Sequence, residues 1–295
     1  MSNQLSTKNL FERDDVKKKF QEILGKKSAA FITSVLQIVS QNSLLAQAEP
    51  TSVYQAAAVA ATLDLPLNNN LGFAYIVPYN QKFKDESGQW KSKQVAQFQI
   101  GYKGFIQLAQ RSGQFKSISA APIYQGQILN ENPLDGYEFD FTKKSDILIG
   151  YAAKFKLING YEATLFMNID QLKKHGSRYS KTFTNDKGLW NTDFEAMASK
   201  TVIKLLLSKY APMSIEMQNA ITTDQSVINN AETLEVTYID NQLELPNKEE
   251  ERLALLISDA KTVEQLISFK EEIVAFPDLS VNYETKFSEL SEKEV

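Results

Sequence analysis

Two predicted helices each carry polar side chains spaced four residues apart, which places each set on a single helix face. The sets are Lys103, Gln107 and Arg111 within 102–112, and Lys200, Lys204 and Ser208 within 193–210. A nucleic-acid backbone offers one negative charge per nucleotide, so rows of cations and polar donors of this kind bind it. The spacing leaves two interpretations open: a binding surface for a sugar–phosphate chain, or the solvated face of an ordinary amphipathic helix.

A third group of candidates lies in the polar segment 176–187. Arg178, Tyr179 and Lys181 place an aromatic ring between two cations, an arrangement that suits an unpaired strand. Cations bind the phosphates, while the ring stacks on a base. Ordinary loops contain such triplets too, so both alternatives remain. Lys116, at the start of a predicted strand, adds another cation, and Trp190 is either a stacking ring or a core anchor.

The residue types that most catalytic sites need are scarce. The chain has no cysteine and one histidine, His175, which excludes thiolate nucleophiles and zinc sites with several histidines. We expect His175 at the surface near a helix end. The segment 25–28 is not a phosphate-binding loop, because Phe20 and Lys27 replace its first glycine and its hydroxyl. We therefore predict no catalytic residue, no metal site and no cofactor.

Asp135, Glu138 and Asp140 are the acids nearest to a metal-dependent nuclease pattern. Glu138 and Asp140 alternate with aromatic residues over 137–142, so we expect them on the solvent face of a strand. A lysine two places after a suitable acid, which two-metal nucleases usually have, does not follow. A nuclease stays as an alternative function.

Charge is distributed unevenly along the chain. The net charge is −4, yet residues 1–234 carry five more basic than acidic residues, and residues 235–295 carry nine more acidic than basic ones. This asymmetry predicts a nucleic-acid-facing body with an acidic tail. The chain has neither a run of about 18 apolar residues nor the apolar segment of a secretion signal, so we expect no membrane contact. Together with the absence of cysteine, this predicts a cytoplasmic location.

Hydrophobic periodicity predicts the elements that position these residues. Helices are expected over 12–24, 28–45, 51–63, 102–112, 170–175, 193–210 and 214–234. Strands are expected over 72–79, 94–101, 115–126, 137–142 and on both sides of Asn159-Gly160, a pair that favours a type I′ hairpin turn. Gly113 is expected to end its helix in a left-handed conformation, and Thr192 with Glu195 to form a capping box.

These elements predict an α+β fold with a helical N-terminal part, a sheet with an inserted helix, and a long capped helix. We expect a core over 1–234, an acidic linker over 235–250, and a small module over 251–295 with one or two amphipathic helices at 251–275.

Two separated blocks resemble the RecT family of phage and prophage recombinases. Residues 101–127, GYKGFIQLAQRSGQFKSISAAPIYQGQ, resemble its signature region. Residues 189–212, LWNTDFEAMASKTVIKLLLSKYAP, resemble its second block, a Trp-x-x-Asp-Phe-x-x-Met-x-x-Lys-Thr pattern. The resemblance spans roughly residues 20–225, and the order of the blocks makes it far more specific than either cation row.

The resemblance implies a protein that anneals single-stranded DNA without ATP and without bond-breaking chemistry. Such proteins coat single strands as rings or helical filaments and pair them with complementary strands in homologous recombination. The implied fold is a bent antiparallel sheet backed by a long helix. The implied partners are single-stranded DNA, the annealed duplex, further copies of the chain and, through the C-terminal module, a 5′→3′ exonuclease or a host single-strand-binding protein. A passive protein that only protects single strands remains an alternative.

The family pattern carries over to particular positions of this chain. Lys103 and Arg111 match basic positions of the first block, Lys200 matches the Lys-Thr position of the second, and Lys116 closely follows the first block. Lys204 stands where family members often have arginine. The positive charge is kept, but the bidentate hydrogen bonding of a guanidinium is lost. The expected DNA-binding set is Lys103, Gln107, Arg111, Lys116, Arg178, Tyr179, Lys181, Lys200 and Lys204.

Overall fold

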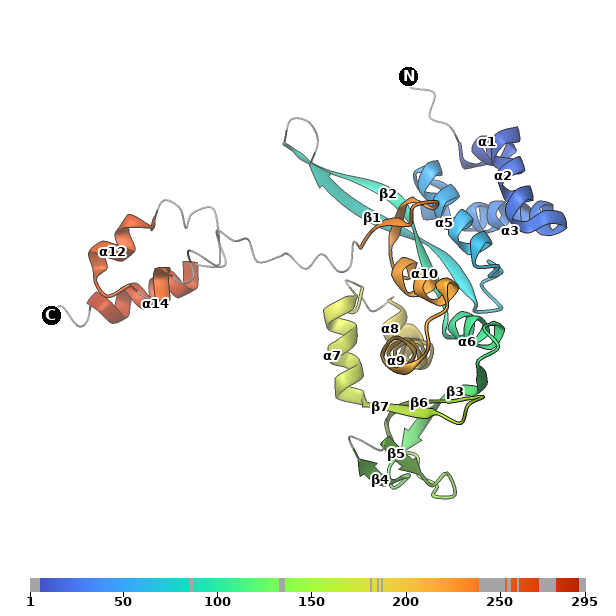
Figure 1. Ribbon diagram of the computed structural model, residues 1–295. Helices are drawn as coiled ribbons and strands as arrows, with labels where there is room; N and C mark the ends of the chain where they lie inside the picture. The colour runs from blue at the N-terminus through green and yellow to red at the C-terminus, as the bar shows by residue number, and fades with distance from the viewer. Residues whose placement is uncertain are drawn as a thin grey trace. The chain divides into compact units, whose positions relative to one another are not determined.

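The computed structural model describes residues 6–84, 88–132, 136–180, 182–184, 186, 188–238, 253, 256–258, 260–270 and 280–291. The chain separates into two compact units, residues 1–241 and 242–295. Helices combine with antiparallel strands, which confirms the predicted α+β class (Figure 1).

The N-terminal part of the first unit is helical, as expected. It contains α1 (Thr7–Glu12), α2 (Asp14–Leu24), α3 (Ser28–Gln41), α4 (Ser43–Ala46) and α5 (Pro50–Thr62). The helix predicted over 28–45 divides at Asn42, because this side chain accepts hydrogen bonds from the N–H groups of Leu44 and Leu45 and so starts a new helix. Phe11 and Phe20 stack with ring centroids 5.7 Å apart, which joins α1 to α2.

Two long strands, β1 (Ala74–Lys84) and β2 (Trp90–Ile100), form a hairpin that extends beyond its base at α5 (Figure 1). The strands are longer than the sequence predicts because their lysine-rich ends also pair, from Ala74 with Ile100 to Lys84 with Trp90. Helix α6 (Tyr102–Arg111) follows β2 directly. Gly113 just after it has a φ of 69°, so the predicted left-handed helix end is confirmed.

A three-stranded antiparallel sheet has the order β3 (Phe115–Tyr124), β6 (Leu148–Leu157), β7 (Glu162–Asn168). A short hairpin of β4 (Ile128–Asn132) and β5 (Gly136–Phe139) stands beside β7. The predicted β6–β7 hairpin is confirmed, but the type I′ turn is wrong. Only Gly160 has a positive φ, of 91°, and its N–H bonds to the Leu157 carbonyl at 3.1 Å. The connection is therefore a three-residue loop with a glycine bulge.

The long helix α9 (Phe194–Tyr210) packs over β3, β6 and β7. Figure 1 looks down its axis, with α7 (Ile169–Tyr179) on one side and α6 on the other. The predicted Thr192–Glu195 capping box is wrong, because Thr192 ends α8 (Leu189–Thr192). Asp193 instead caps α9 by accepting the Ala196 N–H at 3.2 Å.

Two other predicted boundaries shift. Helix α7 is longer than the predicted 170–175, so Arg178 and Tyr179 lie on a helix and not in a loop. The helix predicted over 214–234 is only its first half, α10 (Ile215–Thr223). At Gln225 φ becomes 64°, and Ser226 bridges to Phe98 of β2. The chain then forms the hairpin of β8 (Val227–Asn230) and β9 (Glu235–Thr237).

The second unit has a small apolar core of its own. Its described helices include α12 (Val263–Ser268) and α14 (Ser280–Ser291). Leu253, Ile257 and Leu266 are almost fully buried and pack together with Leu290. Most of the predicted linker, residues 239–250, lies outside the described residues, whereas its first residues, 235–237, pair with β8 of the first unit.

Candidate nucleic-acid interface

A groove of about 590 Å³ opens between the β1–β2 hairpin and the N-terminal ends of α6 and α9. We call it the main groove. Tyr75 of β1 and Tyr102 of α6 supply aromatic rings, and Lys103 and Lys200 supply cations. Two acids also line the groove, Asp193, the cap of α9, and Glu195 in its first turn. Rings that can stack on bases beside cations that can bind phosphate are the groups that an unpaired strand requires.

Two glycines allow α6 to approach this groove closely. A Cβ on Gly101 would collide with the carbonyl oxygen of Gly72, and one on Gly104 would collide with that of Phe73. The Gly101 N–H also donates to the Phe73 carbonyl at 2.9 Å. The Gly-Tyr-Lys-Gly sequence at 101–104 therefore locks the start of α6 against the chain that leads into β1.

The N-terminal end of α6 is itself suited to an anion. Gly101 is its N-cap and has no side chain to satisfy the first N–H groups of the helix. Such uncapped groups, together with the helix dipole, attract negative charge. Lys103, exposed in the first turn, adds a full positive charge at the same place.

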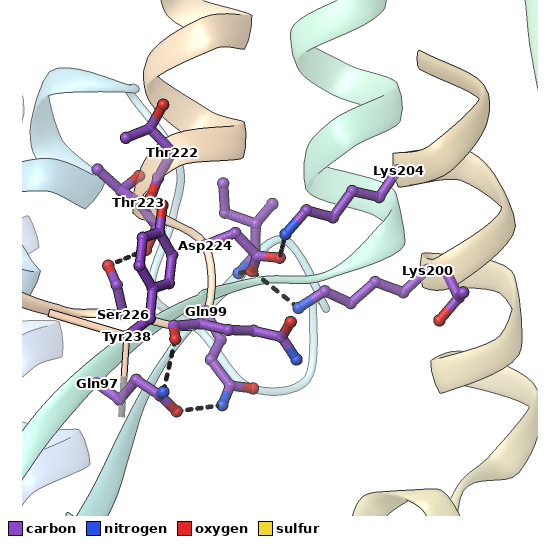
Figure 2. Close-up of polar contacts among 12 residues, drawn as sticks. Gln97, Gln99, Lys200, Lys204, Thr222, Thr223, Asp224, Ser226 and Tyr238 are labelled. Atoms are coloured by element: carbon purple, nitrogen blue, oxygen red, sulfur yellow. Dashed lines mark hydrogen bonds and ion pairs between the residues drawn. The ribbon is translucent and has the colours of Figure 1, made fainter. Parts of the chain in front are cut away.

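Lys200 and Lys204 converge on one buried carboxylate, that of Asp224 (Figure 2). The Lys200 Nζ lies 2.8 Å from Oδ1, and the Lys204 Nζ lies 2.7 Å from Oδ2. The Ile100 backbone N–H also donates to Oδ1, at 2.8 Å. Lys200 is only 6% exposed and Asp224 1%, so the interpretation of Lys200 as part of a solvated face is wrong.

The two ammonium groups decide the charge state of this cluster. Burial opposes ionisation of Asp224, but Lys200 and Lys204, helped by the Ile100 N–H, hold its pKa below the usual value. Burial lowers the pKa of Lys200, and Asp224 partly offsets that effect. Two lysines share one carboxylate here, so the cluster has one more basic than acidic side chain beside the main groove.

A smaller hollow of about 180 Å³ lies on the other side of Lys200, between α7 and α9. This side hollow is lined by His175 and Tyr179 of α7 and by Lys200 and Lys204 of α9, among others. His175 is half-buried rather than at the surface, and its ring centroid lies 4.6 Å from that of Tyr179. Burial, followed by the charges of Lys204 and Arg178, lowers the pKa of His175 to about 4, so the imidazole is neutral at pH 7.

Trp190 lines the side hollow, whereas Arg178 lies next to it, beside the Tyr179 ring. Arg178 is exposed, and its guanidinium lies 5.3 Å from the centre of the Tyr179 ring. Trp190 is 4% exposed and packs between Phe183 and Phe194, with centroid distances of 5.9 Å to each. Of the two alternatives for Trp190, the core anchor is confirmed.

Arg111 and Gln107 face a different part of the molecule. The Arg111 guanidinium donates to the carbonyl oxygens of Leu63, at 2.7 Å, and Asp64, at 3.2 Å. It therefore satisfies the C-terminal end of α5, where Asp64 has a φ of 45°. Gln107 borders a hollow beside Asp64, outside the main groove. Lys103, Gln107 and Arg111 therefore share a helix face, but each side chain has different neighbours.

The structure gathers part of the predicted set. Lys103 and Lys200 line the main groove, while Tyr179, Lys200 and Lys204 line the side hollow. Lys116 is exposed at a bulge at the start of β3 and lines neither. Lys181 lies outside the described residues.

Sequence reasoning missed Asp224, Tyr75 and Tyr102. Tyr102 stands inside the Gly-Tyr-Lys-Gly block, so a signal for it was present. Asp224 has no such signal, because it falls in a segment whose periodicity predicts helix. Its partners, Lys200 and Lys204, precede it by 24 and 20 residues, so no local sequence pattern links them to it.

Among the residues that the structure describes, no three His, Asp or Glu side chains come together as a group that could hold a metal ion. Across the same part of the chain, no helix combines the length and apolar character that a membrane span needs.

The sequence model of the RecT family matches residues 29–237, more than half of the chain, and this protein belongs to that family. Among curated proteins it is similar to RecT of Escherichia coli (strain K12), with 30% identity over 219 residues that cover 68% of this chain and 75% of that protein. It is also similar to the uncharacterized protein YqaK of Bacillus subtilis (strain 168). That identity is 43% over 251 residues, covering 82% of this chain and 81% of YqaK. Family membership supports a single-strand annealing role in DNA recombination.

Proposed function

We propose that this protein coats single-stranded DNA as an oligomer and pairs it with a complementary strand, without ATP. The observation that carries the proposal is the main groove, where stacking rings and cations meet at the uncapped start of α6. The family match supports it independently.

In this proposal the backbone of one strand lies along the groove. Lys103 and the α6 N–H groups bind a phosphate, and the Lys200–Lys204–Asp224 cluster supplies positive potential behind it. Arg178 and Tyr179 of α7 extend the path, Lys116 extends it past β3, and Lys181 is proposed as a further cation on sequence grounds. Arg111 and Gln107 act from the neighbouring surface. Because the protein holds the backbone, the base edges remain available to a second strand, which reads the sequence by pairing.

Oligomerisation follows from the size of the site. A groove of this volume accommodates only a few nucleotides, so a row of copies lengthens the contact and raises avidity. Residues 242–295, which are acidic and carry their own core, serve in this proposal as the module for an exonuclease or a single-strand-binding protein. The protein would act in the cytoplasm of a bacterial host.

The direct test is an annealing assay with two complementary oligonucleotides, labelled as a fluorescence donor–acceptor pair, in buffer without nucleotide. We expect the protein to raise the pairing rate well above the spontaneous rate, and electron microscopy of the same mixture to show rings or filaments. Binding with an unchanged pairing rate would identify a passive protecting protein and contradict the proposal.

The alternative function, a metal-dependent nuclease, is tested in a second assay. Labelled single-stranded DNA is incubated with the protein and Mg²⁺ or Mn²⁺, and its length is followed on a denaturing gel. We expect full-length DNA throughout. Progressive shortening that depends on the metal would support a nuclease instead.

A further inference from the structure

A chain of uncharged polar groups continues from the main groove along the loop between α5 and β1. A hollow of about 280 Å³ lies there, between α3 and residues 67–70. On α3, Ser34, Gln37 and Gln41 share one face because they are three and four residues apart. From the loop, Asn68, Asn69 and Asn70 line the opposite side. We call this the amide hollow.

The amide hollow is adjacent to two other hollows, with which it shares lining residues. Asn69 and Asn70 line the amide hollow and the main groove alike. Ser34 and Asn68 line both the amide hollow and a third hollow of about 350 Å³, which is bordered by Gln107. A strand that enters at Lys103 therefore reaches the amide hollow at the next side chains along this loop.

The amide groups are available to a ligand. Among the residues that the structure describes, the carboxamides of Gln37, Gln41, Asn69 and Asn70 have no hydrogen-bond partner, and all four side chains are exposed. Beyond the amide hollow, the Gln107 carboxamide oxygen is buried and has no hydrogen-bond donor among the described residues.

The chemistry of this lining differs from that of the main groove. None of the residues that line the amide hollow is charged, so it has no group to neutralise a phosphate. A carboxamide instead offers one donor group and one acceptor, which match the edge of a base. Asparagine and glutamine recognise adenine through N6 and N7, an edge that remains exposed in a base pair. Contact of this kind is compatible with annealing.

We propose that the amide hollow binds the edges of bases on the same strand whose phosphates lie in the main groove. This inference rests on the proposed function and assigns Gln37, Gln41, Asn69 and Asn70 to base contacts. The position of the hollow beside the cationic groove, with Asn69 and Asn70 in both linings, favours bases over a peptide segment, which carboxamides could also bind. The contact has no ionic part, so it contributes affinity without salt dependence.

The test compares two DNA ligands of equal length, an ordinary oligonucleotide and one made of abasic units, by fluorescence anisotropy. The full-length protein carries Gln37→Ala with Gln41→Ala, or Asn69→Ala with Asn70→Ala. We expect each pair to weaken binding of the ordinary strand about 10-fold, as for two lost hydrogen bonds. Binding of the abasic strand, and the slope of affinity against salt, should not change.

A matched control is available on α3 itself. Thr33 and Ser40 are exposed, lie outside the amide hollow and bond only to carbonyl oxygens of their own helix. Thr33→Ala with Ser40→Ala should bind both ligands as the wild type does. Circular dichroism and size-exclusion chromatography without DNA accompany every variant.

Three outcomes would overturn the inference. An equal loss on both ligands would place the contact on the sugar–phosphate chain. A change in oligomer size without DNA would identify a protein interface. Wild-type affinity in both pairs would leave the hollow without a role in binding. If the wild type itself did not bind single-stranded DNA, the proposed function would fail instead, so the two failures are distinguishable.

Discussion

At the scale of residues, helical spacing did not predict that Lys200 and Lys204 form a buried cluster with Asp224. The sequence places the two lysines correctly on one side of α9, but helical spacing alone cannot say whether that side meets water or protein. The counter-charge comes from Asp224, brought in by the turn after α10. Only tertiary structure decides that these cations are bonded inside the protein.

The cluster predicts a stability effect. Asp224→Asn keeps the side-chain shape but removes the carboxylate that pairs with the buried Lys200 and with Lys204, and unpaired buried charges are strongly destabilising. We expect the free energy of unfolding in urea to fall by about 3 kcal/mol. Lys200→Met combined with Asp224→Asn should recover part of this, since the fully buried charge of Lys200 is removed and only the part-buried Lys204 loses its partner. A loss below about 1 kcal/mol in the single variant would show that the charges are not coupled.

His175 predicts a pH dependence. Its pKa of about 4 in the folded protein lies below the ordinary value of 6.5. The unfolded chain therefore takes up a proton between pH 6.5 and 4 while the folded protein does not. The contribution to stability is complete above pH 6.5 and is lost as the pH falls toward 4.

The measurement is a proton NMR titration, which is simple because the chain has a single histidine. We expect the His175 resonance to titrate near pH 4, and urea unfolding of His175→Gln to show a shallower decline below pH 6.5 than the wild type. A titration near 6.5 would mean that the side hollow is open to solvent.

At the scale of elements, local signals predicted most of the fold and long-range pairing accounts for the rest. The helices at 51–63, 102–112 and 193–210 follow from periodicity, the end of α6 follows from Gly113, and the β6–β7 hairpin follows from two β-rich runs on either side of Asn159-Gly160. The segment after Thr223 was predicted as helix, yet it pairs with β2 through Ser226 and with itself as β8–β9. Such pairing depends on residues more than 100 positions away, as between Phe98 and Ser226.

The start of α6 gives a prediction at this scale. Gly101→Ala puts a methyl group against the Gly72 carbonyl and displaces the first turn of α6, so we expect a loss of about 2–4 kcal/mol and weaker DNA binding. Gly113→Ala is the comparison, because its Cβ would meet open space and only the positive φ is strained. That variant should lose about 1 kcal/mol and bind DNA normally. Equal effects at both glycines would contradict close packing at 101.

At the scale of the whole molecule, the division of charge corresponds to a division of structure. The first unit carries the grooves, and the second has a separate core and most of the acidic excess. The sequence predicted a boundary at 234, but β9 and the Tyr238 hydroxyl, which bonds to the Thr222 carbonyl, belong to the first unit.

Truncation after Asn241 should therefore leave annealing in vitro unchanged and impair recombination in cells, if the second unit binds partners. Truncation after Leu234 also removes β9, uncovers Val227 and Ile228, and should lower stability. Thermal melting and the oligonucleotide assay check both. Loss of annealing in the variant truncated after Asn241 would show that residues 242–295 take part in DNA pairing.

In the proposed function, the main groove holds the phosphate backbone of an unpaired strand. The most direct measurement is the salt dependence of single-stranded DNA binding for the wild type, Lys103→Gln, and the surface control Lys8→Gln, whose residue is 74% exposed on α1. We predict that Lys103→Gln weakens binding to every sequence alike and lowers the slope of log affinity against log salt by about 0.7, with no change in the control. An unaltered slope in Lys103→Gln, with wild-type affinity, would contradict it.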